Sequence, residues 1–217
     1  RVSAHKGRVV HLHSATYYVW MRNVTLALDE EVSKHITQVL RMKVGEALLV
    51  TDGKGTKAKA IITDDHRKRC VVKIENREKE KQPAPTVCIA ISLLKNAARF
   101  EWFLEKATEI GVSEIIPLLC DRTEKEKFRQ ERLQNIITSA MLQSQQCWMP
   151  KLHEPTPLQK VLEDDRFPQK FIAHCLENEK QSLNELLKHQ SSIILIGPEG
   201  DFTEKEIAKA IEKNYEP

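Results

Sequence analysis

The chain has 217 residues, of which 41% are hydrophobic and 30% charged, and its formal net charge is +3 at pH 7. With seven Gly and nine Pro, this composition excludes collagen-like, low-complexity and largely disordered proteins. No apolar run approaches the ~18 residues of a membrane-spanning helix, and the opening residues carry charge where a secretion signal needs an apolar core. We therefore expect a cytoplasmic protein with no membrane partner. The five cysteines include no C-x-x-C pair, so we expect reduced thiols and no metal site.

Positive charge is concentrated in the first part of the chain. Residues 1–82 hold 17 Lys and Arg against 10 Asp and Glu, whereas residues 83–217 hold 17 against 21. A basic first part indicates a surface that meets a polyanion. The alternative is a solvated face that is merely rich in lysine and arginine, and charge alone leaves both open.

The first part predicts one helix and several short antiparallel strands. Asp29 is placed to cap a helix whose apolar residues recur on one face: Val32, Ile36, Val39 and Leu40. The stretches EALLVTD, TKAKAIIT and RCVVKIENR are typical of strands, and the first two are joined by the turn Asp52–Gly55. Residues 1–80 are thus expected to form a small barrel-like domain, followed by a linker in the charged, proline-containing segment 78–85.

After the linker, strands and helices are predicted to alternate. The expected strands are TVCIAISLL, SEIIPLL, KFIAHC and SIILIG. The expected helices are RFEWFLEKATEIGV, which Gly111 ends, residues 130–146, and two helices opened by the capping boxes Ser182–Glu185 and Thr203–Glu206. This alternation predicts an α/β domain over residues 84–217, built on a parallel sheet.

The sharpest local signal is LIGPEGDFTEKEI, residues 195–207. A buried strand runs into Gly197, Pro198, Glu199 and Gly200, and a well-capped helix follows. In α/β sheets, ligands bind beyond the carboxyl ends of the strands, where loop amides and helix N-termini face them. The loop matches neither a P-loop nor G-x-G-x-x-G, so it supports neither an NTPase nor a classical dinucleotide fold. The alternative is an ordinary Gly-Pro turn.

Other polar residues follow neighbouring strands and helices. Arg122, in the segment 120–124, could contact a phosphate or a developing oxyanion. His174 follows the third strand, where a lone histidine is more often a hydrogen-bonded core residue than a base. Gln143 and Ser144 close the long helix, where a polar cluster is more often a solvated helix end than a site. In the first part, the cations Arg41, Arg67, Lys68 and Arg69 would suit contacts to an RNA backbone.

These segments together resemble the RsmE family of 16S ribosomal RNA uridine-N3 methyltransferases. The matching stretches occur in the family's order over about residues 28–217: HITQVLRMKVGE, TDGKG, RFEWFLEKATEIGVSEIIPLLCDRTE, SAMLQSQ and LIGPEGDFTEKEI. The resemblance implies a PUA-like β-barrel followed by a SPOUT α/β methyltransferase domain with a trefoil knot. It further implies S-adenosyl-L-methionine as methyl donor, 16S rRNA of the small ribosomal subunit as partner, and a homodimer.

The resemblance also assigns site residues. It implies that the cofactor lies against two loops: Ile196, Gly197, Pro198, Glu199 and Gly200 in one, and His174, Leu176 and Glu177 in the other. It places Arg122 in catalysis and Gln143 and Ser144 near the target base, and Arg41 matches the arginine of the barrel. With the basic turn Arg67–Arg69, these residues form the expected RNA-binding set.

The chain departs from the family's pattern in three places. Asp201 stands where the family's GPEGGF has its last glycine, and it is expected to add negative charge beside the pocket. The closing segment, roughly LGxRxLRTETA, would follow Pro217, and a chain of residues 1–217 alone is expected to bind S-adenosylmethionine weakly. The first ~25 residues do not match the family's opening.

Two other functions remain open from the residues alone. One is a non-catalytic RNA-binding protein whose α/β part is a dimerisation scaffold. The other is an α/β enzyme acting on a small phosphorylated ligand, which would favour more Gly, Lys and Ser in the segment 197–202 than are present.

Overall fold

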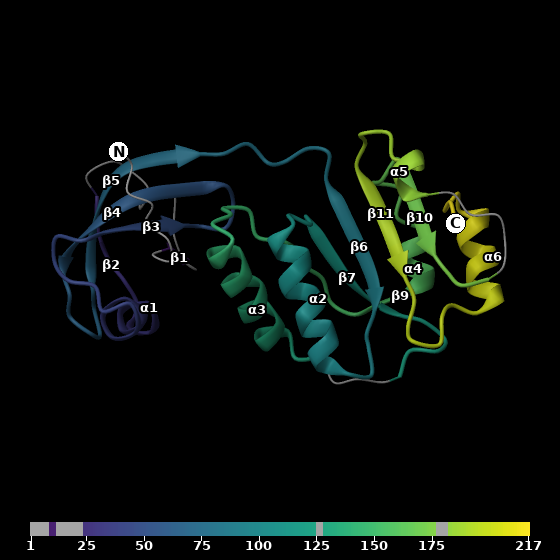
Figure 1. Cartoon of the computed structure of the whole chain (residues 1–217), viewed down its shortest axis with the longest axis horizontal. Coiled ribbons are helices and arrows are strands. Elements are labelled where there is room, and N and C mark those ends of the chain that lie inside the picture. Colours follow the sequence, from purple (N-terminus) through teal and green to yellow (C-terminus); the bar gives the residue numbers. More distant parts are fainter. Residues whose placement is uncertain (1–8, 12–23, 125–127, 177–181) are drawn as a thin grey trace. The chain divides into compact units, whose positions relative to one another are not determined.

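The computed structural model describes residues 9–11, 24–124, 128–176 and 182–217, and the chain divides into two compact units. The first unit comprises Arg1–Gln82 and Met141–Met149, and the second comprises Pro83–Ala140 and Pro150–Pro217. Each unit has its own sheet and its own hydrophobic core (Figure 1).

The first unit is built on a five-stranded sheet with the order β1-β3-β4-β5-β2. Its elements are β1 (Val9–His11), β2 (Thr25–Ala27), α1 (Glu30–Lys34), the π-helix η2 (His35–Val39), β3 (Ala47–Thr51), β4 (Thr56–Asp64) and β5 (Val71–Lys79). The predicted antiparallel pairing of β3, β4 and β5 is confirmed, whereas β1 pairs with β3 in parallel. β5 extends through Lys79, so the first two residues of the predicted linker are strand.

The helical segment of the first unit begins as predicted and then changes its winding. Asp29 caps α1, because its carboxylate accepts the N–H of Val32 at 2.8 Å. At His35 the winding becomes that of a π-helix, whose hydrogen bonds span five residues. The wider turn moves Val39 off the apolar face, so Val39 is 68% exposed and its predicted burial is wrong. Ile36 and Met42 are fully buried in the core.

Residues 147–149 pair with the turn between β3 and β4. The N–H of Gly55 donates to the carbonyl of Cys147, and the N–H of Met149 donates to the carbonyl of Gly53, both at 2.8 Å. The sequence places residues 141–149 in the second domain, but these bonds bring them into the first unit. Backbone N–H and carbonyl groups of the turn therefore form hydrogen bonds with a segment that lies about 90 residues further along the chain.

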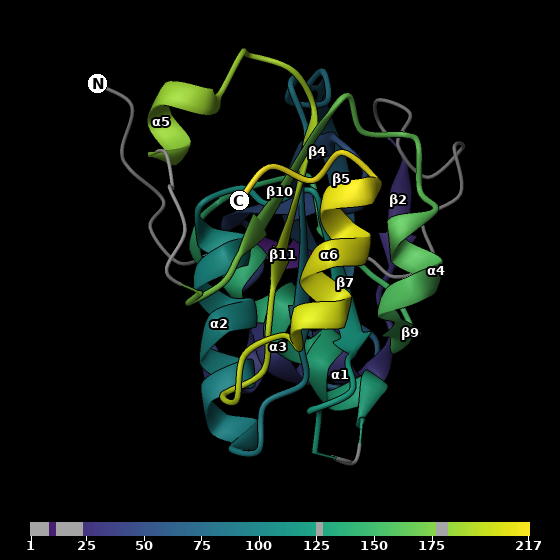
Figure 2. The same ribbon diagram turned by 90° about the vertical axis from the view of Figure 1, so that its right-hand side faces the viewer.

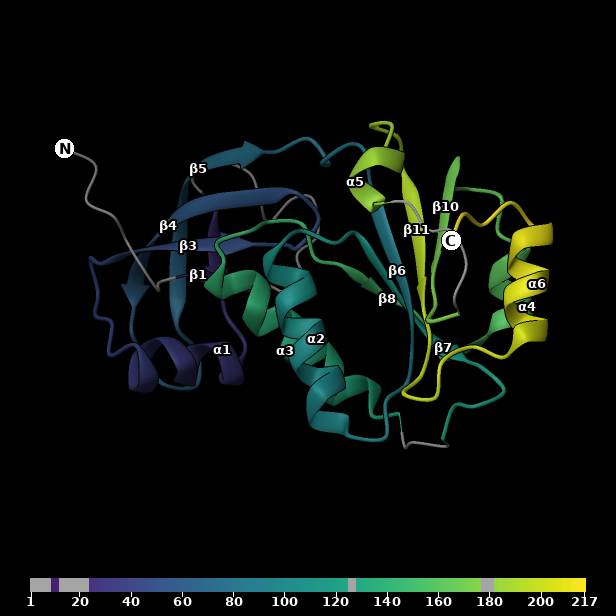
Figure 3. The same cartoon turned by 45° about the vertical axis from the view of Figure 1, so that its right-hand side comes forward.

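The second unit is built on a parallel sheet with the strand order β10-β11-β6-β7-β8, and β9 also pairs with β7. Its strands are β6 (Val87–Ser92), β7 (Glu114–Leu119), β8 (Lys151–Leu152), β9 (Thr156–Pro157), β10 (Gln169–Ala173) and β11 (Ser192–Ile196). Its helices are α2 (Ala97–Glu109), α3 (Gln130–Gln143), α4 (Leu158–Leu162), α5 (Leu183–Leu186) and α6 (Glu204–Glu212). The predicted parallel sheet is confirmed. Figures 2 and 3 show α4 and α6 on one side of the central strands and α2 on the other.

The helix ends follow the local sequence in most places. Gly111 adopts φ +88° and ends α2, as predicted. Thr203 and Glu206 form the predicted capping box of α6. The capping box predicted at Ser182 is wrong, because the Ser182 side chain makes no cap hydrogen bond to α5. Among the described residues, no helix combines the length and apolar character needed to cross a membrane.

Replacing Gly55 by Ala should destabilise the first unit. An added Cβ would lie 2.3 Å from the Trp148 ring, and φ at Gly55 is +89°. Gly45 is a matched control, because it has φ +87° and no atom within 4 Å of an added Cβ. We expect Gly45→Ala to lower the free energy of unfolding by ~1–2 kcal/mol through backbone strain alone. Gly55→Ala should lose a further ~1–3 kcal/mol through overpacking, as measured by urea denaturation. Equal losses in the two variants would contradict the Trp148 contact.

Candidate functional site

Four loops lie at one edge of the parallel sheet of the second unit. The strands β10, β11, β6 and β7 are neighbours and run in the same direction, so their carboxyl ends lie together (Figure 1). The described residues that follow them are 174–176, 197–202, 93–95 and 120–124. This is the edge at which the sequence predicts a ligand site.

The segment Gly197–Asp201, here called the GPEGD loop, is bonded to the other three loops. Oε1 of Glu199 accepts the N–H of Lys95 at 3.1 Å. The carbonyl of Gly200 accepts Nη1 of Arg122 at 2.6 Å, and Oδ2 of Asp201 accepts the N–H of Cys175 at 2.7 Å. The loop after β11 thus holds the loops after β6, β7 and β10 in one assembly.

The GPEGD loop is also restrained from within. An added Cβ at Gly197 would lie 3.1 Å from the buried Phe202 ring, so the backbone passes close over that side chain. The N–H of Asp201 donates to the carbonyl of Pro198 at 2.9 Å. Asp201 has φ +62°, a left-handed conformation that Gly adopts most readily and that Asp tolerates. Its carboxylate does not stand beside the loop as an unpaired charge, because Oδ1 accepts the N–H of Phe202 at 2.8 Å and Oδ2 that of Cys175.

The loop that carries Arg122 is held by hydrogen bonds that the sequence did not predict. The hydroxyl of Thr123 accepts the N–H of Cys120 at 2.8 Å and lies 2.7 Å from that of Ser92. The N–H of Asp121 donates to Glu206 at 2.9 Å, so the buried capping glutamate of α6 serves two loops. Only the capping box was visible in the sequence. Arg122 itself is exposed.

Cys120 lies in the same loop but is not set up as a nucleophile. Burial, and then the negative charge of Glu206, raises the pKa of its thiol to about 12. The thiol is therefore protonated at neutral pH, and thiols react as thiolates.

His174 is placed by the loop after β10. It is 9% exposed, and its Nδ1 accepts the N–H of Leu176 at 3.2 Å. This hydrogen bond assigns the ring proton to Nε2, which is buried and has no partner among the described residues. His174 also lines a cavity of about 260 Å³ with the apolar side chains of Phe171, Leu186 and Ile194. Of the other predicted residues in this loop, Leu176 packs against the core, and Glu177 lies outside the described residues.

The predicted RNA-binding residues lie in the first unit. Arg41 and the turn Arg67–Arg69 are exposed. Lys43 and Asp65 form an ion pair at 3.3 Å, which joins the segment after η2 to the segment that leads into the basic turn. The pKa of Glu30 is held below its ordinary value, first by the hydrogen bond from Lys34 and also by the charges of Lys68 and Arg67. The positive charge of the basic turn therefore extends to Glu30, at the start of α1.

Gln143 and Ser144 are not in the same unit as Arg122. Both belong to the segment 141–149, which groups with the first unit, whereas Arg122 belongs to the second. Gln143 is exposed at the end of α3, and the Ser144 hydroxyl donates to the carbonyl of Met141 at 3.2 Å. The structure thus brings Arg122 together with the GPEGD loop, and the two helix-end residues remain predictions.

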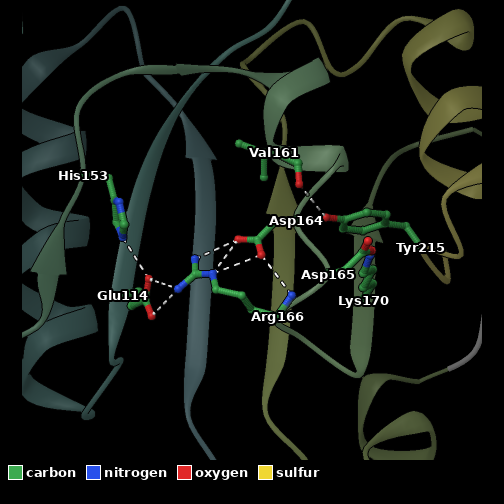
Figure 4. A network of polar contacts seen from close by, with 8 residues as sticks. All are labelled: Glu114, His153, Val161, Asp164, Asp165, Arg166, Lys170 and Tyr215. Atoms are coloured by element: carbon green, nitrogen blue, oxygen red, sulfur yellow. Dashed lines mark hydrogen bonds and ion pairs between the residues drawn. The ribbon is translucent and has the colours of Figure 1, made fainter.

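A network of charged residues lies toward the amino ends of β7 and β10, opposite the GPEGD loop (Figure 4). Arg166 donates to Asp164 at 2.8 Å and to Glu114 at 3.1 Å, and Nε2 of His153 lies 2.8 Å from Glu114. Tyr215 donates to the carbonyl of Val161 at 3.3 Å. The contacts of Arg166 join β7 to the segment before β10, and the Tyr215 hydrogen bond joins the segment after α6 to α4. Contacts between separate elements of this kind indicate a stabilising role. Among the described residues, no group of three or more His, Cys, Asp or Glu could hold a metal ion.

Comparison with known proteins gives the family. A profile described as "RNA methyltransferase domain" matches residues 80–217, and one described as "RNA methyltransferase PUA domain" matches residues 28–75. Ribosomal RNA small subunit methyltransferase E from Synechocystis is 28% identical over 200 residues, covering 89% of this chain. The chain belongs to the RsmE family of RNA methyltransferases. It spans 65% of the length of the Synechocystis relative.

Solved structures agree with this family. A protein described as a probable rRNA methyltransferase from Porphyromonas gingivalis is 34% identical with a TM-score of 0.83, and the alignment covers 88% of this chain and 82% of that one. A ribosomal RNA small subunit methyltransferase E from Neisseria gonorrhoeae, bound to S-adenosyl methionine, has a TM-score of 0.82 at 24% identity. That alignment covers 96% of this chain and 87% of the other. The predicted fold class, a SPOUT-type parallel-sheet domain preceded by a PUA-like domain, is confirmed. The knot itself stays a prediction.

The charged network of Figure 4 should make stability depend on acid pH. Burial tends to raise the pKa of Asp164, but the hydrogen bonds and charge of Arg166 outweigh it and hold that pKa below its ordinary value. Its stabilisation is therefore present at neutral pH and is lost as the pH falls through the lowered pKa. Asp164→Asn should lower the free energy of unfolding by ~1 kcal/mol at pH 7 and by less near pH 3, as followed by thermal melts. A loss that does not depend on pH would contradict this role.

Proposed function

We propose that this protein transfers a methyl group from S-adenosyl-L-methionine to N3 of a uridine in 16S rRNA of the small ribosomal subunit, acting as a homodimer. The observation that carries the proposal is the assembly of three strand-end loops around a fourth, the GPEGD loop, in a chain of the RsmE family. The substrate atom and the dimer follow from the family resemblance and are the parts that experiment must test.

The residues of the loops fit the cofactor. S-adenosylmethionine supplies an electrophilic methyl group on a sulfonium sulfur. The buried Nε2–H of His174, which lacks a described partner, can donate to a polar group of the cofactor. Leu176 and Ile196 offer apolar surface for its adenine, and Gly197, Pro198, Glu199 and Gly200 form the wall held at the sheet edge. Fixed loops of this kind orient a bound methyl donor, and orientation can lower a barrier by up to ~7–11 kcal/mol.

Arg122 is proposed to act on the substrate. Its guanidinium is exposed and donates to the carbonyl of Gly200, which fixes the side chain at the GPEGD loop. Removal of the N3 proton from uracil leaves negative charge on the ring oxygens. A cation held at this position stabilises that charge as it develops, which is the role that the sequence predicts for Arg122.

The first unit is proposed to hold the rRNA. Its exposed cations Arg41, Arg67, Lys68 and Arg69 suit phosphates, which carry no sequence information and set the position of the RNA. Gln143 and Ser144 are proposed to contact the RNA near the target base.

A methylation assay tests the function directly. Small ribosomal subunits from bacterial cells lacking this protein are incubated with the purified protein and S-adenosylmethionine, and the rRNA is digested and analysed by mass spectrometry. We expect one added methyl group on one uridine. Because N3 takes part in Watson–Crick pairing, the modified position should also stop reverse transcription. Transfer to another atom or to another RNA would overturn the proposal, and an absence of transfer would favour the non-catalytic alternative.

Arg122→Ala should impair methyl transfer and leave cofactor binding nearly unchanged. We expect single-turnover transfer to fall at least ~10-fold, a loss of ~1.4 kcal/mol of transition-state stabilisation. Arg122→Lys should restore part of the rate, because the charge remains. Arg132→Ala is a matched control, since Arg132 pairs with Glu101 and joins α3 to α2. Arg122 would instead have a structural role if Arg122→Ala lowered the melting temperature steeply while the rate of methyl transfer per folded molecule stayed normal.

Replacing Arg67, Lys68 and Arg69 together by Ala should weaken RNA binding without regard to sequence. Each lost phosphate contact removes up to ~0.7–0.9 from the slope of log K against log salt concentration. We expect a shallower slope in titrations with an rRNA fragment over a range of salt concentrations. An unchanged slope would show that the turn is a solvated basic face.

A further inference from the structure

Asp201 connects two loops that neighbouring strands carry. One carboxylate oxygen accepts the N–H of Cys175, in the loop after β10, at 2.7 Å. The other accepts the N–H of Phe202, in its own loop after β11, at 2.8 Å. Hydrogen bonds to an ionised carboxylate are stronger than those between neutral groups. The side chain therefore acts as a bridge between the segments 174–176 and 197–202.

The loop after β10 depends on this bridge for its conformation. Two successive backbone N–H groups, those of Cys175 and Leu176, are bound by the Asp201 carboxylate and by Nδ1 of His174, respectively. The second bond leaves the proton of the imidazole on Nε2, the buried atom that has no described partner. Loss of the bond between Cys175 and Asp201 would free the backbone next to His174, and the imidazole ring would no longer be held in one orientation.

The bridge belongs to the loops and not to the core. Asp201 is half-buried and Cys175 is exposed, and neither belongs to the hydrophobic core of the second unit. The left-handed backbone at Asp201, with φ +62°, is one that Gly and Asn also adopt. Substitutions to those two residues therefore change the bridge while the backbone keeps its shape.

We infer that Asp201 is a positioning residue for S-adenosylmethionine. Its carboxylate holds the His174–Leu176 loop against the GPEGD loop before the cofactor arrives, so that both walls of the site are in place. Ordering a loop during binding costs affinity, and a loop that is already held avoids that cost. This inference rests on the proposed function, because it concerns the cofactor that the two loops are proposed to hold.

Two substitutions in the full-length protein test the inference. Asp201→Gly removes both acceptors, and Asp201→Asn keeps one carbonyl oxygen and removes the charge. We expect Asp201→Gly to bind S-adenosylmethionine about fivefold more weakly by isothermal titration calorimetry, and Asp201→Asn to be intermediate. Hydrogen–deuterium exchange of the peptide containing Cys175 and Leu176 should be at least threefold faster in the unliganded Asp201→Gly protein. The melting temperature should change little in either variant.

Asp164→Asn is the matched control. Asp164 also accepts a backbone N–H, that of Arg166 at 3.0 Å, but it lies before β10, whereas Asp201 acts on the loop after that strand. We expect Asp164→Asn to lower the melting temperature and to leave both the cofactor affinity and the exchange of the Cys175 peptide unchanged.

The possible outcomes separate the inference from the proposed function. If the wild-type protein gives no binding heat with S-adenosylmethionine, the proposed function fails and the inference fails with it. If the wild type binds and Asp201→Gly binds within twofold of it, the inference alone is wrong, whatever the exchange rate. If Asp164→Asn weakens cofactor binding as much as Asp201→Gly does, the effect is one of general stability, and the inference is also wrong.

Discussion

The candidate site depends on three hydrogen bonds to one loop. Glu199, Gly200 and Asp201 are consecutive residues after β11, and each is bonded to the loop that follows a different strand. A parallel sheet brings these loops to the same edge but does not fix them to one another. The bonds do so, because two carboxylates accept backbone N–H groups and one carbonyl accepts a guanidinium. The conformation of any one loop is therefore linked to that of the other three.

The two ends of the parallel sheet have different chemistry. At the carboxyl ends the polar contacts run mainly between side chains and loop backbone, and they leave exposed groups such as the Arg122 guanidinium. At the amino ends the charged groups bind each other, as in the contacts of Arg166 with Asp164 and Glu114 (Figure 4). Charged groups that form ion pairs with one another stabilise the fold. Charged groups that face solvent at the carboxyl ends of the strands are free to contact a ligand.

The glycine-rich turn of the first unit shows how a motif can have an unexpected structural role. The turn Asp52–Gly55 is typical of a simple hairpin. Gly55 is instead covered by Trp148, and the backbone of Gly53 and Gly55 pairs with residues 147 and 149. The absence of a side chain at Gly55 is what allows the Trp148 ring to lie there.

Short-range patterns determined much of the fold. The Asp29 and Thr203 caps, the strand β4 and the end of α2 at Gly111 depend on residues within a few positions, and the structure confirms them. Family motifs likewise located the GPEGD loop and Arg122 at one sheet edge. The sequence did not determine that Asp201 binds Cys175, that Glu206 serves the Arg122 loop, or that residues 141–149 join the first unit. These contacts join residues that are 26, 85 and about 90 positions apart in the sequence. A local sequence pattern does not indicate which distant backbone group a side chain will contact. Only the tertiary structure decides them, because strand order determines which loops become neighbours.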